Sequence, residues 1–408
     1  MKTLFNRNFT FLILGQASSL LGNYGLKFAL SMYVLERTGS ASVFAGMLAL
    51  SMLPTILLSP FGGILADRAN RRNVMVALDL LSGLAVFAAG FAMLWGKDLI
   101  VIGALLIVLS VLGAFESPAV QACIPQMLSG ENIIKGNAVV SQVASIAALL
   151  TPFLGSLFYT AFGIRLVLGA AVVCFFLTAL LECFIRLDYK KPETKEKLGA
   201  IVKEDFSVTM RFLRREQPGI RKLLLFAAMV SLFVAGIAVV GFPYLVRTVL
   251  GLSAAHYGAA ESAMGVAAIL GSLCAALLAK RLRHLAFVLA GFGLCLLPCG
   301  AAFLVPAAAF PRYLILLLMF CLCQMGCSLF SAYAISVIQG RTPEQLMGKV
   351  MSCVFTLSLC AQPVGQVVYG ALFDRFSDCV YWVLIPSGLI VGAVGAASVR
   401  FFAGLEKD

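Results

Sequence analysis

Three ionisable residues lie inside long apolar stretches of this sequence: Lys27, Glu116 and Glu261. A carboxyl group that is withdrawn from water favours its neutral form, so such an acid can take up and release a proton. Glu116 is followed by Pro118, and a proline inside a helix leaves a backbone carbonyl without its usual donor. We interpret Glu116 as a proton-coupling residue. The alternatives are an acid hydrogen-bonded to neighbouring helices or one ion-paired near the cytoplasmic side.

Lys27 is the most unusual of the three. It lies 18 residues beyond Phe9, where its apolar stretch begins, which corresponds to about 27 Å along a helix. Glu261 has a matching depth in its own stretch and is the proposed acidic partner, whereas Glu116 differs in depth by about 13 Å. The alternative is that Lys27 extends to the outer membrane surface without a partner.

A cluster of charges separates two long apolar stretches. Between Gly62 and Arg72 the chain holds one acid, Asp67, and three arginines. Within hydrocarbon each such residue costs about 2.5–3.5 kcal/mol, so we place the cluster in a tight turn at a membrane surface. Asp79, two turns further on, is expected to partner Arg71 or Arg72. Glu182, four residues before Arg186, is expected to form a surface pair with it.

The composition is that of a polytopic membrane protein. Of 408 residues, 61% are hydrophobic and 12% charged, whereas soluble proteins hold about 25% charged residues. The net charge of +12 follows membrane topology and does not indicate nucleic acid. Most of the 12 Cys lie in apolar runs, and there are two His. We therefore expect no metal centre, no cofactor and no enzyme activity.

Apolar stretches of about 20 residues, the length that spans a bilayer, predict an all-α protein with twelve transmembrane helices. We place them at 9–35, 42–66, 73–95, 99–124, 138–160, 165–186, 221–246, 257–279, 285–306, 312–338, 350–373 and 380–402.

The basic residues predict the orientation. Both termini and the even-numbered loops carry 24 of the 31 Lys and Arg, against six in the odd-numbered loops. Because basic residues favour the cytoplasmic side, both termini are expected there. The longest loop, 187–220, is predicted to carry an amphipathic helix on the membrane surface. It would join two domains, residues 1–186 and residues 221–408.

Weak internal repetition supports two related halves. Ser141 and Pro152 recur as Ser352 and Pro363, both 211 positions later. Parallel repeats of this kind are typical of transporters. Frequent glycines in the fifth, eighth and eleventh spans favour close packing between helices.

Twelve spans, two halves and the charged turn together resemble the major facilitator superfamily. Its signature in this turn is matched by Gly63, Asp67, Arg68, Arg71 and Arg72, with Asn70 in place of a second glycine. The resemblance implies two pseudo-symmetric six-helix bundles with access alternating between the two membrane sides. It also implies a conformational latch, in which Asp67 faces the N-terminal end of a helix beginning near Gly348. We include Asp79 in this latch.

Several shorter pieces resemble the macrolide-efflux type of drug exporter within this superfamily. They include Arg7-Asn8-Phe9, Thr38-Gly39-Ser40 and the loop from Thr342 to Val350. This resemblance implies proton-coupled efflux of small amphipathic molecules such as macrolides across the cell membrane, by a protein that we expect to be monomeric. The alternatives are export or flipping of a native metabolite, such as a siderophore or lysophospholipid, and a membrane sensor that transports nothing.

Polar and aromatic residues inside the predicted spans are candidates for the substrate cavity, because apolar walls with a few polar groups suit amphipathic ligands. The candidates are Asn23, Tyr24, Phe28, Phe115, Gln121, Gln142, Gln324, Tyr333 and Gln362.

Overall fold

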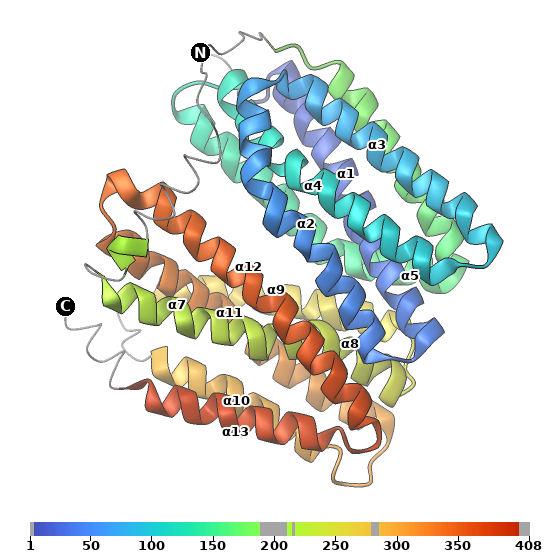
Figure 1. Ribbon diagram of the computed structural model, residues 1–408, viewed down its shortest axis with the longest axis vertical. Helices are drawn as coiled ribbons and strands as arrows, with labels where there is room; N and C mark the ends of the chain where they lie inside the picture. Colours follow the sequence, from blue (N-terminus) through green and yellow to red (C-terminus); the bar gives the residue numbers. More distant parts are fainter. Residues whose placement is uncertain (1–3, 188–209, 214–216, 279–284, 400–408) are drawn as a thin grey trace. The chain divides into compact units, whose positions relative to one another are not determined.

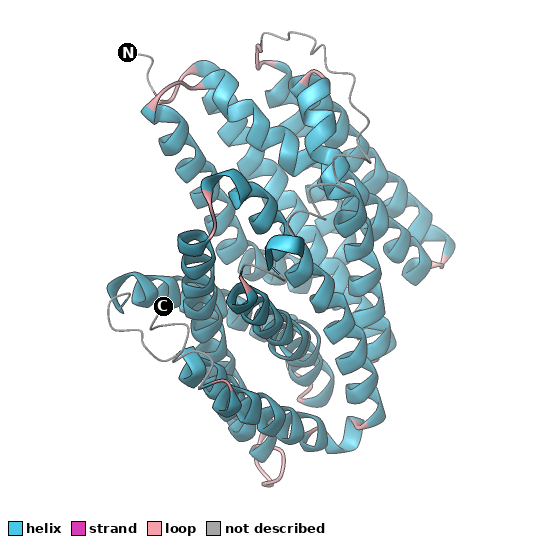
Figure 2. Ribbon diagram, turned by 60° about the vertical axis from the view of Figure 1, so that its left-hand side comes forward, coloured by secondary structure: helices cyan, strands magenta, loops and turns pink. Residues whose placement is uncertain are grey.

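The computed structural model describes residues 4–187, 210–213, 217–278 and 285–399, which form helices and contain no strand (Figures 1 and 2). In chain order, the long helices are α1 (Arg7–Thr38), α2 (Ala41–Arg68), α3 (Arg71–Ala92), α4 (Asp98–Met127), α5 (Glu131–Cys183), α7 (Pro218–Val230), α9 (Ala254–Leu278), α10 (Leu285–Ala301), α11 (Ala309–Arg341), α12 (Glu344–Arg375) and α13 (Tyr381–Ala397). The all-helical class predicted from the sequence is confirmed for these residues.

Helix α5 contains two of the predicted spans. Its 53 residues would extend about 80 Å if straight, far beyond the roughly 30 Å of a hydrocarbon core. The helix is interrupted at Gly163, whose φ of 73° lies in the left-handed region that glycine adopts without strain. The break falls between the spans predicted at 138–160 and 165–186.

The predicted span 221–246 is helical and combines α-helical with π-helical turns. After α7, the turns Ser231–Ala235, Ile237–Gly241 and Leu245–Val249 are π-helical, around the short α8 (Phe242–Tyr244). This segment packs closely on α12, because a Cβ added to Gly365 would lie 2.1 Å from the carbonyl oxygen of Leu232. Small residues allow such backbone contact between membrane helices.

The number of membrane crossings is tested only in part by the structure. Within the described residues, seven helices are long and apolar enough to cross a membrane, and two shorter apolar helices accompany them. The chain is therefore a multi-pass membrane protein, and the count of twelve stays a prediction. The linker 187–220 lies mostly outside the described residues, and so does its amphipathic helix.

The chain divides into two compact units, but not strictly at the linker. The first, called here the N-terminal unit, comprises Met1–Arg37 and Leu50–Glu196. The second, the C-terminal unit, comprises Thr38–Ala49 and Lys197–Asp408. The beginning of α2 thus belongs to the C-terminal unit, although the rest of that helix belongs to the N-terminal unit.

A carboxylate of α12 explains why the first turn of α2 belongs there. Asp374 accepts hydrogen bonds from the backbone N–H groups of Ala41 (2.7 Å) and Ser42 (3.0 Å). It also accepts one from the hydroxyl of Ser40 at 2.6 Å. The Ser40 oxygen in turn accepts from the N–H of Val43 at 3.2 Å. The exposed donors of the first helical turn are therefore satisfied by side chains, and the negative charge favours this end of the helix dipole.

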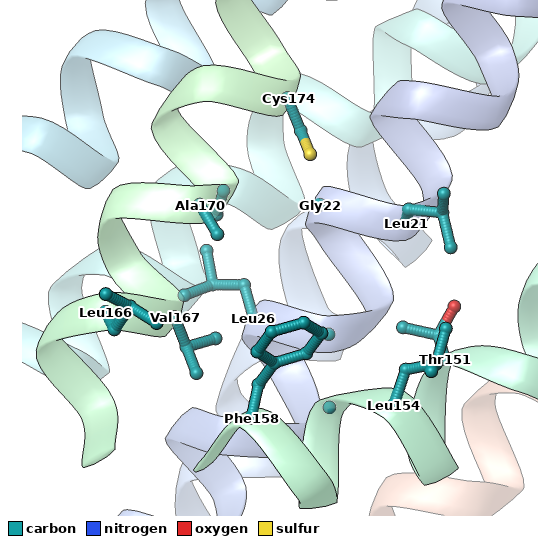
Figure 3. Close-up of a pocket in the computed structure, with 13 residues that line it drawn as sticks. Leu21, Gly22, Leu26, Thr151, Leu154, Phe158, Leu166, Val167, Ala170 and Cys174 are labelled. Carbon is teal, nitrogen blue, oxygen red and sulfur yellow. The ribbon is translucent and has the colours of Figure 1, made fainter. Parts of the chain in front are cut away.

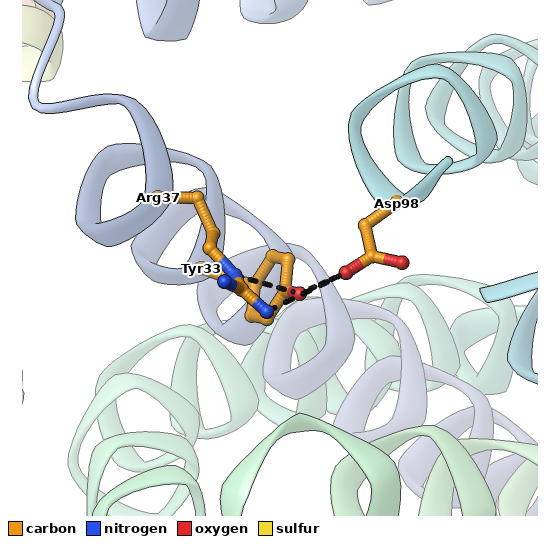
Figure 4. A network of polar contacts seen from close by, with 3 residues as sticks. All are labelled: Tyr33, Arg37 and Asp98. Atoms are coloured by element: carbon orange, nitrogen blue, oxygen red, sulfur yellow. Dashed lines mark hydrogen bonds and ion pairs between the residues drawn. The ribbon is translucent and has the colours of Figure 1, made fainter. Parts of the chain in front are cut away.

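A polar network lies at the end of α1 within the N-terminal unit (Figure 4). The Tyr33 hydroxyl donates to the Asp98 carboxylate and accepts from Arg37 Nε at 3.0 Å. Arg37 is also ion-paired with Asp98 at 3.8 Å. Nearby, the Tyr159 hydroxyl donates to Glu36 at 2.5 Å. Because the Arg37 side chain is 64% exposed, the ion pair itself contributes little stability.

The cap on α2 predicts a pH-dependent contribution to stability. Burial raises the pKa of Asp374, but hydrogen bonds from Ser40, Ser42 and Ala41 outweigh it and lower the pKa below its ordinary value. The carboxylate therefore stabilises the folded protein above the unfolded-state pKa of about 3.9, and this contribution is lost as the pH falls through the lower folded-state pKa. Asp374→Asn should lower the stability at neutral pH by about 0.3–1 kcal/mol, because the first turn of α2 loses a negatively charged acceptor.

Thermal unfolding of the purified protein in detergent measures this effect. The exposed Asp378 supplies the control, Asp378→Asn, which should change little. The difference between wild type and Asp374→Asn should shrink in acid. Equal melting temperatures at neutral pH for the two variants would contradict the cap.

Candidate functional site

One face of α1 carries four polar residues. Gln16, Ser19, Asn23 and Lys27 are spaced by three, four and four positions, which places them along one side of a helix. Gln16 is 8% exposed and Ser19 is 2% exposed, whereas Lys27 is exposed. Ser19 was not predicted as a site residue, although this spacing could have identified it.

The Ser19 hydroxyl connects two carboxyl groups from other helices. It lies 3.1 Å from Oδ1 of Asp79 on α3 and 3.2 Å from Oε1 of Glu116 on α4. Asp79 is fully buried, and Glu116 is half-buried. These helices are held together because α3 packs on both α4 and α5. The structure therefore brings Asp79, predicted for the latch, beside Glu116, predicted for proton coupling.

Glu182 joins the same group, and its prediction as a surface partner of Arg186 is wrong. Its side chain is 0% exposed, and a Cβ added to Gly15 of α1 would lie 3.6 Å from its Cγ. Its carboxyl interacts with those of Asp79 and Glu116. The i, i+4 spacing to Arg186 was misleading because α5 turns this face toward α1 and α3.

Arg71 and Arg72 bind backbone carbonyls. Arg71 donates to the carbonyl of Ala122 at 2.6 Å, and Arg72 donates to that of Cys183 at 2.5 Å. Arg72 Nε also lies 3.4 Å from the carbonyl oxygen of Glu182. Arg72 thus satisfies carbonyls at the C-terminal end of α5, where a cation is favoured by the helix dipole. The hydrogen bond given to Asp79 comes from Ser19 instead, contrary to the partner predicted for it.

Part of the predicted latch lies outside the described residues. The side chains of Gly63, Asp67 and Arg68 on α2 are not described, and neither are those around Gly348 on α12. Asn70, which replaces the glycine of the signature, caps α3 by accepting from the N–H of Asn73 at 3.4 Å. The latch itself stays a prediction.

Lys27 and Tyr24 extend the polar group along α1. The charge of Glu116 interacts with that of Lys27 and with the Tyr24 hydroxyl. The helical depths predicted from sequence had argued against a direct pair, and the structure gives an electrostatic interaction. Lys27 and Glu261 belong to different units, so their pairing stays a prediction.

Glu261 lies on α9 in the C-terminal unit. Its carboxyl accepts a hydrogen bond from the hydroxyl of Tyr257, one turn earlier on the same helix. Tyr257 is 8% exposed, and Oε2 of Glu261 is buried and has no partner within the part of the chain that the structure describes. The environment is thus apolar, with one donor supplied locally.

A cavity of about 370 Å³ lies in the C-terminal unit, between the α7 segment, α11 and α12. Gln324, predicted as a cavity residue, lines it together with the hydroxyl-bearing Ser231, Ser331 and Ser358. The remaining walls are apolar, including Phe330. The three serines were not predicted, since serine in an apolar helix usually bonds its own backbone.

The other predicted cavity residues are distributed over both units. In the N-terminal unit Phe28 is buried, Asn23, Tyr24 and Phe115 are half-buried, and Gln121 and Gln142 are exposed. In the C-terminal unit Gln362 is half-buried, and Tyr333 packs against the apolar core. Whether these residues bind a substrate stays a prediction.

The N-terminal unit has an apolar cavity of about 230 Å³ between α1 and the two halves of α5 (Figure 3). Leu26, Phe158 and Val167 point into it. Gly22 and Gly25 allow α5 to approach α1 closely. A Cβ at Gly22 would lie 2.8 Å from Cβ of Cys174. Such walls suit a hydrocarbon chain.

Apolar membrane helices, buried ionisable groups and a cavity in each unit together define a membrane transporter, and comparisons with known proteins agree. The chain is 23% identical over 390 residues to macrolide efflux protein A of Streptococcus pyogenes, covering 92% of each. It is 26% identical over 357 residues to the multidrug efflux pump Tap of Mycolicibacterium fortuitum, covering 84% of this chain and 83% of that one.

Among solved structures, the nucleoside transporter NupG matches with a TM-score of 0.73 at 12% identity, covering 99% of this chain and all of that one. Residues 12–359 match the model of the Major Facilitator Superfamily. The chain belongs to this superfamily. The resemblance recognised in the sequence is thereby confirmed, and so is the likeness to efflux proteins.

The geometry of Arg72 predicts its role in stability. Arg72→Ala should lower the stability by about 1–2 kcal/mol, because carbonyls at the end of α5 lose a charged donor. Arg186→Ala is the matched control, since Arg186 is exposed and bonds Asn8 through its backbone. Thermal unfolding in detergent measures both.

A double-mutant cycle separates this role from an ion pair with Asp79. Asp79→Asn and Arg72→Ala should be additive to within about 0.5 kcal/mol. A larger coupling energy between them would restore the ion pair predicted from the sequence.

Proposed function

We propose that this protein is a secondary transporter that exports amphipathic small molecules, such as macrolides, in exchange for protons. The relatives named as macrolide and multidrug efflux proteins support the direction and the substrate class. Their identities of 23% and 26% leave the substrate to be tested directly.

The observation that carries the proton coupling is the placement of Glu116. Its carboxyl lies within the membrane-spanning α4, is hydrogen-bonded to Ser19 and interacts with the charge of Lys27. Ionisable residues in membrane helices usually mark a transport pathway or a proton relay. Glu261, hydrogen-bonded to Tyr257 in the other unit, is a second proton-coupling candidate.

The cavity of the C-terminal unit supports an amphipathic substrate. Its walls are mostly apolar, and Gln324 with three serine hydroxyls offers a few polar contacts. An apolar body with a small number of polar groups would match this lining.

Transport would proceed by alternating access between two six-helix bundles in the cell membrane, with both termini cytoplasmic and the protein acting as a monomer. The charged turn, with Asp67 and its arginines, would act as a latch that breaks and re-forms in each cycle. An exposed ion pair contributes about 0–1 kcal/mol, which is small enough to be broken repeatedly.

A second candidate function is the transport of a lysophospholipid. The observation that favours it is the apolar cavity between α1 and α5, whose lining includes Leu26, Phe158 and Val167 (Figure 3). A single acyl chain would fit such walls, whereas a macrolide with many oxygens would not.

Uptake into proteoliposomes with an imposed pH gradient tests both functions. We expect labelled erythromycin to accumulate when the gradient is present and to stop accumulating when an ionophore collapses it. Erythromycin flux that is indifferent to the gradient would contradict antiport. Movement of a fluorescent lysophospholipid without erythromycin flux would favour the second candidate.

Glu116→Gln tests the proposed coupling residue. This variant should lose gradient-driven uptake, because glutamine cannot bind and release a proton, while it keeps downhill flux. The control is Glu36→Gln, which removes an exposed carboxyl from α1 in the same unit. Retained gradient-driven uptake in Glu116→Gln would end the role of this residue.

A further inference from the structure

Three carboxyl groups of the N-terminal unit meet at one buried place. Asp79 of α3 and Glu182 of α5 are both 0% exposed, and Glu116 of α4 is half-buried. The Ser19 hydroxyl of α1 lies within hydrogen-bonding distance of Asp79 and Glu116. Transport by Glu116 alone would not require the other two acids, so their presence calls for an explanation.

The number of hydrogen atoms at Ser19 limits the charge of its neighbours. A serine hydroxyl has one hydrogen, and an ionised carboxylate can only accept. Ser19 Oγ lies 3.1 Å from Asp79 Oδ1 and 3.2 Å from Glu116 Oε1. If both acids were ionised, one of these contacts would join two acceptors. Both contacts are hydrogen bonds only if Asp79 or Glu116 carries a proton and donates it to the serine oxygen.

The second carboxyl oxygen of Asp79 also lacks a hydrogen-bond donor among the described residues. Its Oδ2 and both carboxyl oxygens of Glu182 are buried and accept no hydrogen bond from the described residues. The two carboxyls lie within hydrogen-bonding reach of one another. A proton on either acid would supply the missing donor, and without it two buried charges would repel each other in a medium of low dielectric.

Other titratable groups of the described residues surround the three acids. Lys27 is a cation that interacts with the group, through Glu116. Tyr24 on α1 faces Glu116, and Cys123 on α4 and Cys183 on α5 interact with Glu182. The contacts of Ser19 with Asp79 and Glu116 need one bound proton, and the contact between Asp79 and Glu182 needs a second.

The hydrogen bonds that the structure describes for the nearby arginines go to backbone carbonyls. Arg71 also interacts with Cys123, and Arg72 bonds the end of α5. Gln16 adds a buried amide nitrogen that has no partner among the described residues, one turn before Ser19 on α1.

We propose that Asp79, Glu116 and Glu182, joined by Ser19, form one shared proton site that holds two protons and passes one through the serine hydroxyl. The inference rests on the proposed function only in that substrate exchange would use the proton. The site itself is defined by hydrogen-bonding geometry and burial.

The transfer balances without any further reactant. The Glu116 O–H bond breaks as its proton bonds to Ser19 Oγ, and the original Ser19 O–H bond breaks as that proton bonds to Asp79 Oδ1. Glu116 becomes a carboxylate beside Lys27, Asp79 becomes neutral, and the serine is regenerated. Glu182 holds the second proton throughout. The reverse transfer recharges Glu116 for the next cycle.

Infrared spectroscopy of the purified protein in phospholipid vesicles, without substrate or gradient, tests the site. Protonated carboxyls have a carbonyl stretch that is separate from that of carboxylates and shifts on exchange into D₂O. We expect this signal at neutral pH in the wild type. Glu182→Gln should remove part of it, and Asp79→Asn should change what remains.

Ser19→Ala decides the relay, since it removes one hydroxyl and is the variant least able to disturb folding. It should shift the carbonyl signal of whichever of Asp79 and Glu116 holds the proton and the carboxylate signal of the other, because each loses its hydrogen bond with Ser19. Ser18→Ala is the matched control, since the Ser18 hydroxyl bonds the Cys174 carbonyl instead, and its spectrum should equal the wild type.

A wild-type spectrum without protonated carboxyls, or one unchanged by Ser19→Ala, would overturn the shared site. This result is independent of the proposed function. Vesicles that show the expected signals but no erythromycin flux would refute antiport and leave the proton site standing. Gradient-driven erythromycin flux together with an unchanged Ser19→Ala spectrum would support antiport and refute the shared proton site.

Discussion

The hydrocarbon core of a membrane contains no water, so a polar group inside it must find its hydrogen bonds within the protein. Ser19 shows how this constraint shapes the N-terminal unit, because one hydroxyl serves carboxyls from two other helices. Each of the helices α3, α4 and α5 contributes one acid to this cluster. The acids are tolerated there because they interact with one another and with α1. A cluster of buried carboxyls that is stable only with bound protons can also release one of those protons.

The same constraint operates where helices end. Arg72 satisfies carbonyls at the end of α5, and Asp374 satisfies amides at the beginning of α2. A transporter that changes shape must break some contacts, and hydrogen bonds at helix ends are open to water when they part. The cap by Asp374 is notable because the rest of α2 belongs to the other unit.

Much of the fold followed from hydropathy, because long apolar runs and clustered arginines reflect the bilayer directly. The break within α5 was also predictable, since Gly163 lies between two runs that together exceed a membrane thickness. The site was harder to predict. Spacing along a single helix linked Glu182 to Arg186 and Asp79 to the arginines, whereas their surroundings are decided by α1 packing against α3, α4 and α5. Glu116 was identified because its burial can be read from its apolar neighbours. Ser19 and Glu182 needed the tertiary contacts.

The central claim is that substrate is exchanged for a proton held by buried carboxyls, and proton release on substrate binding tests it most directly. Purified protein in weakly buffered detergent at neutral pH would be mixed with erythromycin while a pH indicator dye is followed. The account predicts that binding releases protons from the wild type in proportion to the bound fraction. Saturable erythromycin binding with no net proton release at any pH would contradict it.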